Sequence, residues 1–316
     1  MKKYNVKKVV SLLGTALMIL SFVFIGTRLV QYDIDFTMLS SPWVIAGFLM
    51  VSVSIGLFML FAARNFGWIV EDLTGIHIDS GLILPLYCLA NLYKYIPGSV
   101  MYVIGRNRLA VESDEVSHSQ VVVSTVAEGV LIAIAAVSLV VLSVFDYFIT
   151  YLRTTMPPVV WTALVIVFIV GGPIMFLFRR HIAKFLSKHT NGLDFRQLRA
   201  VLGKRLGAGL LLLTSLSLSF LVTLMLLGQP ITPRMAPTIM GMFVLSWMTG
   251  FLTPGAPGGL GVREAAMLLF LGPMMDDGII LSAIVIHRMI YVIGDVLAFG
   301  FAQLYKNVFK TREALR

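Results

Sequence analysis

The sequence has little charge and almost no cysteine. Charged residues make up only 13% of the 316-residue chain, whereas 58% are hydrophobic, and the mean hydropathy is +0.90. This composition excludes a soluble domain of this size and indicates a polytopic membrane protein. The single cysteine, Cys88, excludes a disulfide framework and a cysteine-based metal site.

Motifs for metals, nucleotides and nucleic acids are also missing. The five histidines are scattered without ligand spacing, so neither a metal nor another cofactor is expected. No Walker loop is present, which argues against ATP-driven transport by this chain alone. The net charge of +9 does not indicate a nucleic-acid partner, because the basic residues lie at the ends of apolar segments, where they orient a membrane chain.

Long apolar runs are what the sequence does contain. Six are long enough to span a bilayer, near 9–30, 42–63, 120–145, 159–178, 207–228 and 279–305. The first follows four lysines and has no small-residue cleavage site, so we expect an uncleaved span and not a signal peptide. The chain is therefore predicted to be all-α, with a single transmembrane domain over residues 1–316.

Two further apolar stretches, near 80–110 and 236–273, are interrupted by similar sequences. Residues 97–106 and 254–263 both open with Pro-Gly and end with Arg, and they lie about half the chain length apart. Broken apolar segments at matching positions of two halves point to the binding site of a transporter. The predicted pseudo-repeat halves are about 1–158 and 159–316.

Basic residues predict the orientation. The loop over 179–205 holds eight lysines and arginines against one acid, so it is expected to face the cytoplasm together with both chain termini. The loops at 31–41, 146–158, 229–235 and 274–278 hold only Arg153 and Arg234 and are expected to face outward. The predicted location is the cytoplasmic (inner) membrane.

These sides agree with six full spans only if each broken segment returns to the side from which it entered. Each half then has two spans, a re-entrant hairpin and a further span, and the halves have opposite orientation, as in an inverted repeat. The alternative is that each broken segment is a pair of full crossings, giving ten in all. Charge does not distinguish the two arrangements.

Prolines and glycines at the breaks are candidate binding residues. They are Pro97, Gly98, Pro254, Gly255, Gly258, Gly259 and Gly261. The residues at 262–267 have helical propensity, and a helix that begins inside the membrane presents free N–H groups and a positive dipole end, which suit a phosphate or carboxylate. Ser99 is expected to cap the helix after the first break. The alternative is that the glycines only permit tight helix crossing.

Charged residues inside the apolar segments complete the candidate site. They are Lys94, Arg106, Arg263, Arg288, Glu128, Glu264 and Asp295. Ionisable groups at membrane depth are costly and mark functional paths. Glu128 and Arg288 occupy comparable places in the two halves, so we expect them to pair. The alternative for any one charge is a structural ion pair or a snorkelling interface residue, and it is favoured for Lys94, Arg106 and Arg108, near the cytoplasmic interface.

Two stretches carry a family resemblance. Residues 91–98 with Arg106 and Glu128, and residues 254–264, resemble the lysylphosphatidylglycerol synthase transmembrane-region family, whose best-known member is the flippase module of the multiple peptide resistance factor. The resemblance covers nearly the whole chain. It implies a membrane module that moves an aminoacylated phospholipid, or a related lipid, between leaflets.

The sequence departs from the full-length synthase in one respect. No aminoacyl transferase domain follows the last span, so lysyl transfer is not expected and a lipid-linked sugar or other anionic lipid is an equal substrate candidate. The predicted function is translocation of a lipid with an anionic, phosphate-containing headgroup, and not enzymatic catalysis. Alternatives are an intramembrane lipid-modifying enzyme and a non-transporting scaffold of an envelope-synthesis complex. The partners considered are copies of the same chain and envelope-biosynthesis enzymes.

Overall fold

Every regular element in the part of the chain that the structure describes is a helix. The structure is a computed structural model that describes residues 41–95, 100–113, 115–155, 195–252 and 261–314. Its elements are α2 (Pro42–Thr74), α3 (Ser80–Leu92), the 3-10 helix η2 (Tyr93–Tyr95), α4 (Val100–Glu112), α5 (His118–Thr155), α7 (Phe195–Leu226), α8 (Met235–Leu252), α9 (Val262–Leu271) and α10 (Asp277–Ala314).

Four of the predicted spans are confirmed. The helical stretches long and apolar enough to cross a bilayer are Pro42–Thr74, His118–Ser143, Arg199–Leu226 and Asp277–Val308. The predicted spans at 9–30 and 159–178 lie outside the described residues. One predicted loop boundary was wrong, because helix α5 continues to Thr155 through the expected loop at 146–158. Helix α7 begins at Phe195, inside the polar stretch at 179–205 that was expected to be a surface helix or a loop.

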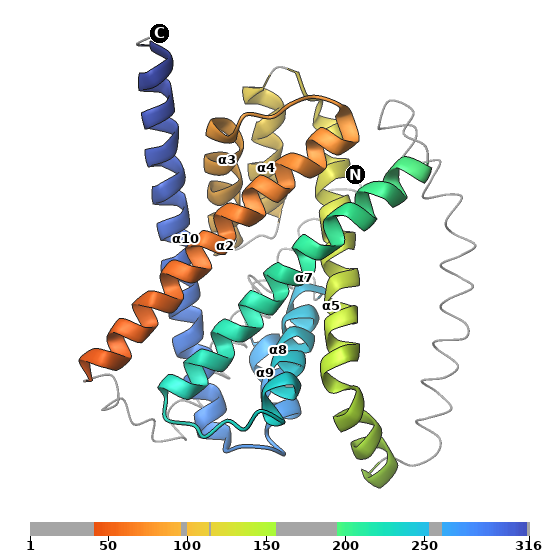
Figure 1. Ribbon diagram of the computed structural model, residues 1–316, viewed down its shortest axis with the longest axis vertical. Coiled ribbons are helices and arrows are strands. Elements are labelled where there is room, and N and C mark those ends of the chain that lie inside the picture. The colour runs from red at the N-terminus through yellow and green to blue at the C-terminus, as the bar shows by residue number, and fades with distance from the viewer. Residues whose placement is uncertain (1–40, 96–99, 114, 156–194, 253–260, 315–316) are drawn as a thin grey trace, which may run out of the picture.

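The described helices show the same sequence of long and short elements two times. A long helix, two short helices and another long helix occur as α2, α3, α4 and α5, and again as α7, α8, α9 and α10. The short pair α3 and α4 lies toward one end of the molecule, whereas α8 and α9 lie toward the other (Figure 1). The polar residues near each interruption are thereby placed well inside the bundle.

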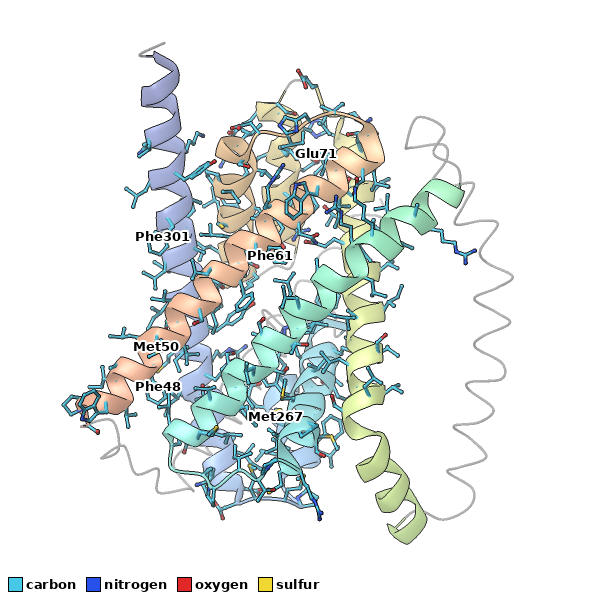
Figure 2. All side chains as sticks on the ribbon, in the orientation of Figure 1. Phe48, Met50, Phe61, Glu71, Met267 and Phe301 are labelled. Carbon is cyan, nitrogen blue, oxygen red and sulfur yellow. The ribbon has the colours of Figure 1, made fainter. Side chains whose placement is uncertain are left out.

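Helix α2 shows how the sequence sets the ends and faces of a span. Pro42 occupies the first turn, where its missing N–H is not needed, and Gly75 ends the helix with a φ of +74° and an N–H bond to the Glu71 carbonyl. Its outer face is apolar, with Met50 69% exposed, as expected for a surface that meets lipid. Figure 2 shows Met50 toward the N-terminal end of α2.

Two larger apolar cores pack the described helices together. One lies among α2, α3, α4, α5 and α10 around Phe66, and the other joins α2, α7, α8, α9 and α10 around Phe220 and Met267. Helices α2 and α10 cross closely where small residues meet. A Cβ on Gly56 would lie 3.1 Å from the Gly294 carbonyl oxygen, so the backbones themselves are in contact.

Candidate functional site

The first buried ion pair lies between α4 and α5. The Arg106 guanidinium pairs with the Glu128 carboxylate, and both side chains are almost fully buried. Tyr87 on α3 donates its hydroxyl to Glu128 Oε1 at 2.9 Å. The guanidinium also lies over two rings, 4.6 Å from the centroid of Phe66 and 4.4 Å from that of Tyr87. These contacts offset part of the cost of burying the two charges.

The second pair connects the first broken segment with α10. Lys94 Nζ lies 2.6 Å from Asp295 Oδ2, and Tyr95 donates its hydroxyl to the same oxygen at 2.6 Å. Asn91 donates its amide N–H to the other carboxylate oxygen at 2.9 Å. Lys94 also lies 4.3 Å from the ring centroid of Tyr291. One carboxylate on α10 therefore accepts three bonds from the end of α3 and from η2.

The third pair lies between α9 and α10. Arg288 pairs with Glu264, whose second oxygen accepts the Gly261 N–H at 2.6 Å. Gly261 precedes α9 with a φ of +82°, a conformation that glycine adopts without strain. The predicted anion position at this helix start is thus partly filled by the chain's own carboxylate, which the helix dipole stabilises.

Arg263 differs from these cations. Its backbone carbonyl accepts the Ser246 hydroxyl at 2.6 Å, and its guanidinium lies 5.4 Å from the ring centroid of Trp247 on α8. Its buried Nε has no hydrogen-bond partner, and no carboxylate lies within ion-pair distance of it in the described chain. This guanidinium has capacity for an anion.

Lys94, Arg263 and Arg288 form one electrostatic group, which we call the cation cluster. The charges of Arg263 and Arg288 both act on Lys94, and that of Arg288 acts on Arg263. The described carboxylates beside them are Glu264 and Asp295, so three positive charges face two negative ones. At 1.5 Å per residue, Arg288 and Asp295 lie more than about 15 Å from either end of their span.

The predicted site residues fall into three sets. Lys94, Arg263, Glu264, Arg288, Asp295 and Gly261 meet around the cation cluster, whereas Arg106 and Glu128 form a separate pair. The remaining predicted residues, Pro97, Gly98, Pro254, Gly255, Gly258 and Gly259, lie outside the described residues together with Ser99.

One expectation and one alternative about individual charges were wrong. Glu128 does not pair with Arg288, because each has a nearer partner on the short helix of its own half, Arg106 and Glu264 respectively. Arg106 does not snorkel toward an interface, since only 2% of its side chain is exposed. Arg108, on the exposed side of the same helix, forms a surface pair with Glu112.

The sequence interpretation missed Asn91, Tyr87 and Tyr291. A signal was available for Asn91, because it precedes Lys94 by three residues and Tyr95 by four, which places all three on one helical face. Tyr291 precedes Asp295 by four residues on α10 in the same way. Polar and aromatic residues spaced by three or four around an intramembrane charge therefore identify its partners.

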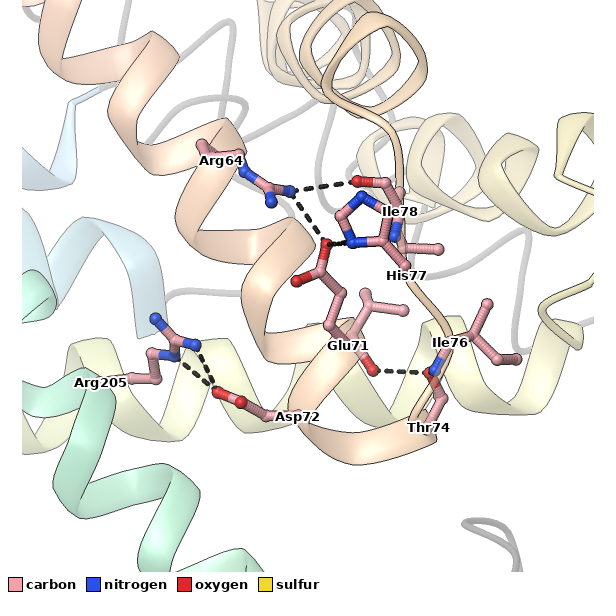
Figure 3. Close-up of polar contacts among 9 residues, drawn as sticks. Arg64, Glu71, Asp72, Thr74, Ile76, His77, Ile78 and Arg205 are labelled. Carbon is pink, nitrogen blue, oxygen red and sulfur yellow. Dashed lines mark hydrogen bonds and ion pairs between the residues drawn. The ribbon is translucent and has the colours of Figure 1, made fainter.

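A further polar network lies at the end of the molecule where α2 ends (Figure 3). Arg64 donates to Glu71 and to the Ile78 carbonyl, both at 3.1 Å, and His77 Nδ1 lies 3.2 Å from the same Glu71 oxygen. Beside it, the Asp72 carboxylate accepts bonds from two residues of α7.

These α7 residues are Lys204 and Arg205, at 3.0 and 2.7 Å from Asp72. Figure 3 shows the contact with Arg205. The Trp68 ring has the guanidinium of Arg64 and that of Arg205 each at 5.1 Å. This network joins α2 to α7 outside the cation cluster, and its partly exposed pairs contribute little stability individually.

Ser219 and His287 form a buried polar contact between α7 and α10. The Ser219 hydroxyl lies 2.6 Å from the Leu216 carbonyl oxygen and 2.8 Å from His287 Nε2. The rings of Phe220 and Phe243 each pack edge-to-face with the His287 ring.

The described chain is thus an all-helical protein with four helices fit to cross a membrane and a net positive polar cluster within their span. Within the described residues, no group of three His, Cys, Asp or Glu side chains is placed to hold a metal ion. No model of a known protein family matches the chain, and no curated protein matches it either.

Proposed function

We propose that the protein moves a lipid with an anionic phosphate headgroup across the cytoplasmic membrane, without chemical change to the lipid. The observation that carries this proposal is the cation cluster, in which Arg263 has no carboxylate partner among the described residues. A phosphate brings oxygens that accept several N–H bonds and a negative charge that pairs with this guanidinium.

The arrangement of the short helices supports translocation. Cations from both broken segments meet at one place, with Lys94 following α3 and Arg263 beginning α9, while these helices lie toward opposite ends of the molecule (Figure 1). An inverted repeat of two halves has this geometry, and transporters of that kind bind substrate between the halves near the bilayer midplane. The family resemblance of both frames supports the same substrate class.

The proposed orientation follows from the basic residues at the two ends. Arg64, Arg108, Lys204 and Arg205 lie at the end where α2 finishes and α7 begins, so we assign this end to the cytoplasm together with both termini. The opposite end carries Asp276 and Asp277 and is assigned to the outer side.

Reconstitution into liposomes tests the proposal. A fluorescent phosphatidylglycerol and a matched phosphatidylcholine are supplied, and movement between leaflets is followed by chemical quenching of the outer leaflet. Because hydrogen bonds to charged groups contribute about 1.5–3 kcal/mol, Arg263→Ala is expected to weaken anionic-lipid binding by roughly 10- to 100-fold. The exposed Arg108→Ala serves as the control and is expected to behave as wild type.

Three results would contradict the proposal. Absence of faster movement of the anionic lipid in wild-type liposomes would remove the transport activity. A chemically altered lipid recovered from the liposomes would instead indicate an enzyme. Full activity of Arg263→Ala and Arg288→Ala, with loss only on changes to the outer helical surface, would indicate a scaffold.

A further inference from the structure

Asp295 is the carboxylate whose surroundings respond most directly to a bound anion. It is 1% exposed, and its cationic partner Lys94 belongs at the same time to the cation cluster. An anion that enters the cluster therefore competes with Asp295 for the same ammonium group. The repulsion that Arg263 and Arg288 exert on Lys94 makes that competition stronger, because the anion relieves it.

Lys94 is built to change partners. An ammonium on a flexible stem rotates freely and bonds as a point charge, unlike a planar guanidinium. The Lys94 side chain is 21% exposed, and the rings of Tyr95 and Tyr291 lie 4.9 and 4.3 Å from its Nζ, so aromatic faces stabilise the cation when it turns away from the carboxylate.

Departure of Lys94 leaves Asp295 with two neutral donors, Asn91 and Tyr95. A carboxylate buried without a cation is unfavourable in a low-dielectric site, and it becomes neutral by taking up a proton. No other described group at Asp295 replaces the lost charge. The other titratable groups whose charge or dipole is coupled to it are Cys88 on α3 and Tyr291 on α10, and neither is a cation.

The described helices packed against α10 supply no substitute cation for Asp295. On α9, Arg263 and Glu264 belong to the cation cluster, as does Arg288 on α10 itself. On the α2 side, the residues that meet Gly294 are Ser52 and Ile55, which do not titrate. His287 bonds to Ser219 of α7 and is flanked by Phe220 and Phe243.

We propose that Asp295 is a proton-binding site coupled to the lipid site, so that each anionic headgroup bound in the cation cluster is accompanied by one proton. This inference rests on the proposed function. The Lys94–Asp295 ion pair breaks, Lys94 bonds to the phosphate, and a proton from water forms an O–H bond on Asp295. The site then has the same net charge when it is empty and when it holds a singly charged headgroup with its proton.

The Arg106–Glu128 pair does not have this property. A guanidinium does not lose its proton, and here it is held between two rings with only 2% of its side chain exposed. The charges that act on Lys94 and Arg263 do not include that of Arg106. Glu128 therefore stays paired whether or not a lipid is bound.

Titration calorimetry with a water-soluble lipid tests the coupling directly. Dihexanoyl phosphatidylglycerol is titrated into the full-length protein in detergent, at one pH in two buffers of different ionisation enthalpy. The expected result is uptake of about one proton per bound lipid, and an affinity that rises about tenfold for each pH unit of acidification in the range where uptake occurs. This measurement needs no substitution.

Two variants assign the proton to its site. Asp295→Asn is expected to bind the lipid without proton uptake and with no pH dependence, whereas Glu112→Gln on the exposed surface of α4 is expected to keep the wild-type response. Proton uptake that persists in Asp295→Asn would overturn the assignment. If Asp295→Asn does not fold, the two-buffer result on the wild type still decides whether a proton is taken up.

The outcomes separate this inference from the proposed function. Binding without proton uptake overturns the inference and leaves translocation to the liposome assay. Proton-coupled binding without movement between leaflets supports the inference and overturns the transport activity. Absence of binding by the wild type overturns the inference, because no anion then displaces Lys94.

Discussion

Removal of one partner from the buried Arg106–Glu128 pair is expected to destabilise the protein strongly. In Glu128→Gln the amide still accepts the Tyr87 hydroxyl, but the Arg106 charge is left without its counter-ion in a site that is almost fully buried. Breaking a buried ion pair in this way costs about 3–5 kcal/mol. Arg106→Met is expected to cost a similar amount, because it leaves the Glu128 carboxylate unpaired.

A double-mutant cycle measures the interaction. The free energy of unfolding is determined by denaturant titration in detergent micelles for the wild type, both single variants and the double variant. The double variant has no buried charge at this place, so its loss is expected to be smaller than the sum of the single losses by about 2–3 kcal/mol. Arg108→Ala, which breaks an exposed pair on the same helix, is expected to change the free energy by about 0.5 kcal/mol or less.

Two results would refute the reasoning. One is a loss below about 1 kcal/mol for Glu128→Gln, which would mean that Arg106 finds compensation from its two aromatic neighbours or from water. The other is strict additivity in the cycle, which would mean that the two charges do not stabilise each other.

The other predictions concern helix crossings and the surface network. Gly294→Ala is expected to destabilise the protein by about 1–3 kcal/mol in the same titration, because the new Cβ would lie 2.9 Å from a backbone oxygen of α2. Gly300→Ala, with open space around it, is expected to be neutral or slightly stabilising. Equal effects of the two substitutions would contradict the close crossing. Gly250→Ala is expected to lower lipid affinity in the calorimetric assay, because its Cβ would displace Arg263, and an unchanged affinity would count against a role for that guanidinium. Asp72→Asn is expected to cost about 1 kcal/mol or less, with the loss shrinking as salt is raised; a loss that salt leaves unchanged would show a buried interaction instead.

Apolar runs were sufficient to predict the four spans because a membrane helix needs about 20 predominantly apolar residues. The Pro-Gly frames at 97–106 and 254–263 were equally visible in the sequence. Helix ends were harder to predict, and helix α5 continues to Thr155, beyond the apolar run that predicted it.

The identity of the charged residues was readable from the sequence, but their pairing was not. Partner choice depends on how far each helix is rotated about its axis, and the lipid-facing and core-facing sides of a membrane helix are both apolar. Glu128 and Arg288 occupy matching places, yet each turns toward the short helix before it. The spacing of Asn91, Lys94 and Tyr95 did indicate that the three side chains share one helical face. The donors to Asp295 were therefore partly predictable.

At the crossing of α2 and α10 two main chains touch. A Cβ on Gly294 would lie 2.9 Å from a backbone oxygen of α2, and a Cβ on Gly56 would lie 3.1 Å from the Gly294 carbonyl oxygen. Sliding of one helix along the other would press these main chains together, whereas a small change in the crossing angle leaves the contact nearly unchanged. If the protein moves a lipid as proposed above, we expect α2 and α10 to pivot at this crossing, so that small rotations there displace the two ends of the molecule.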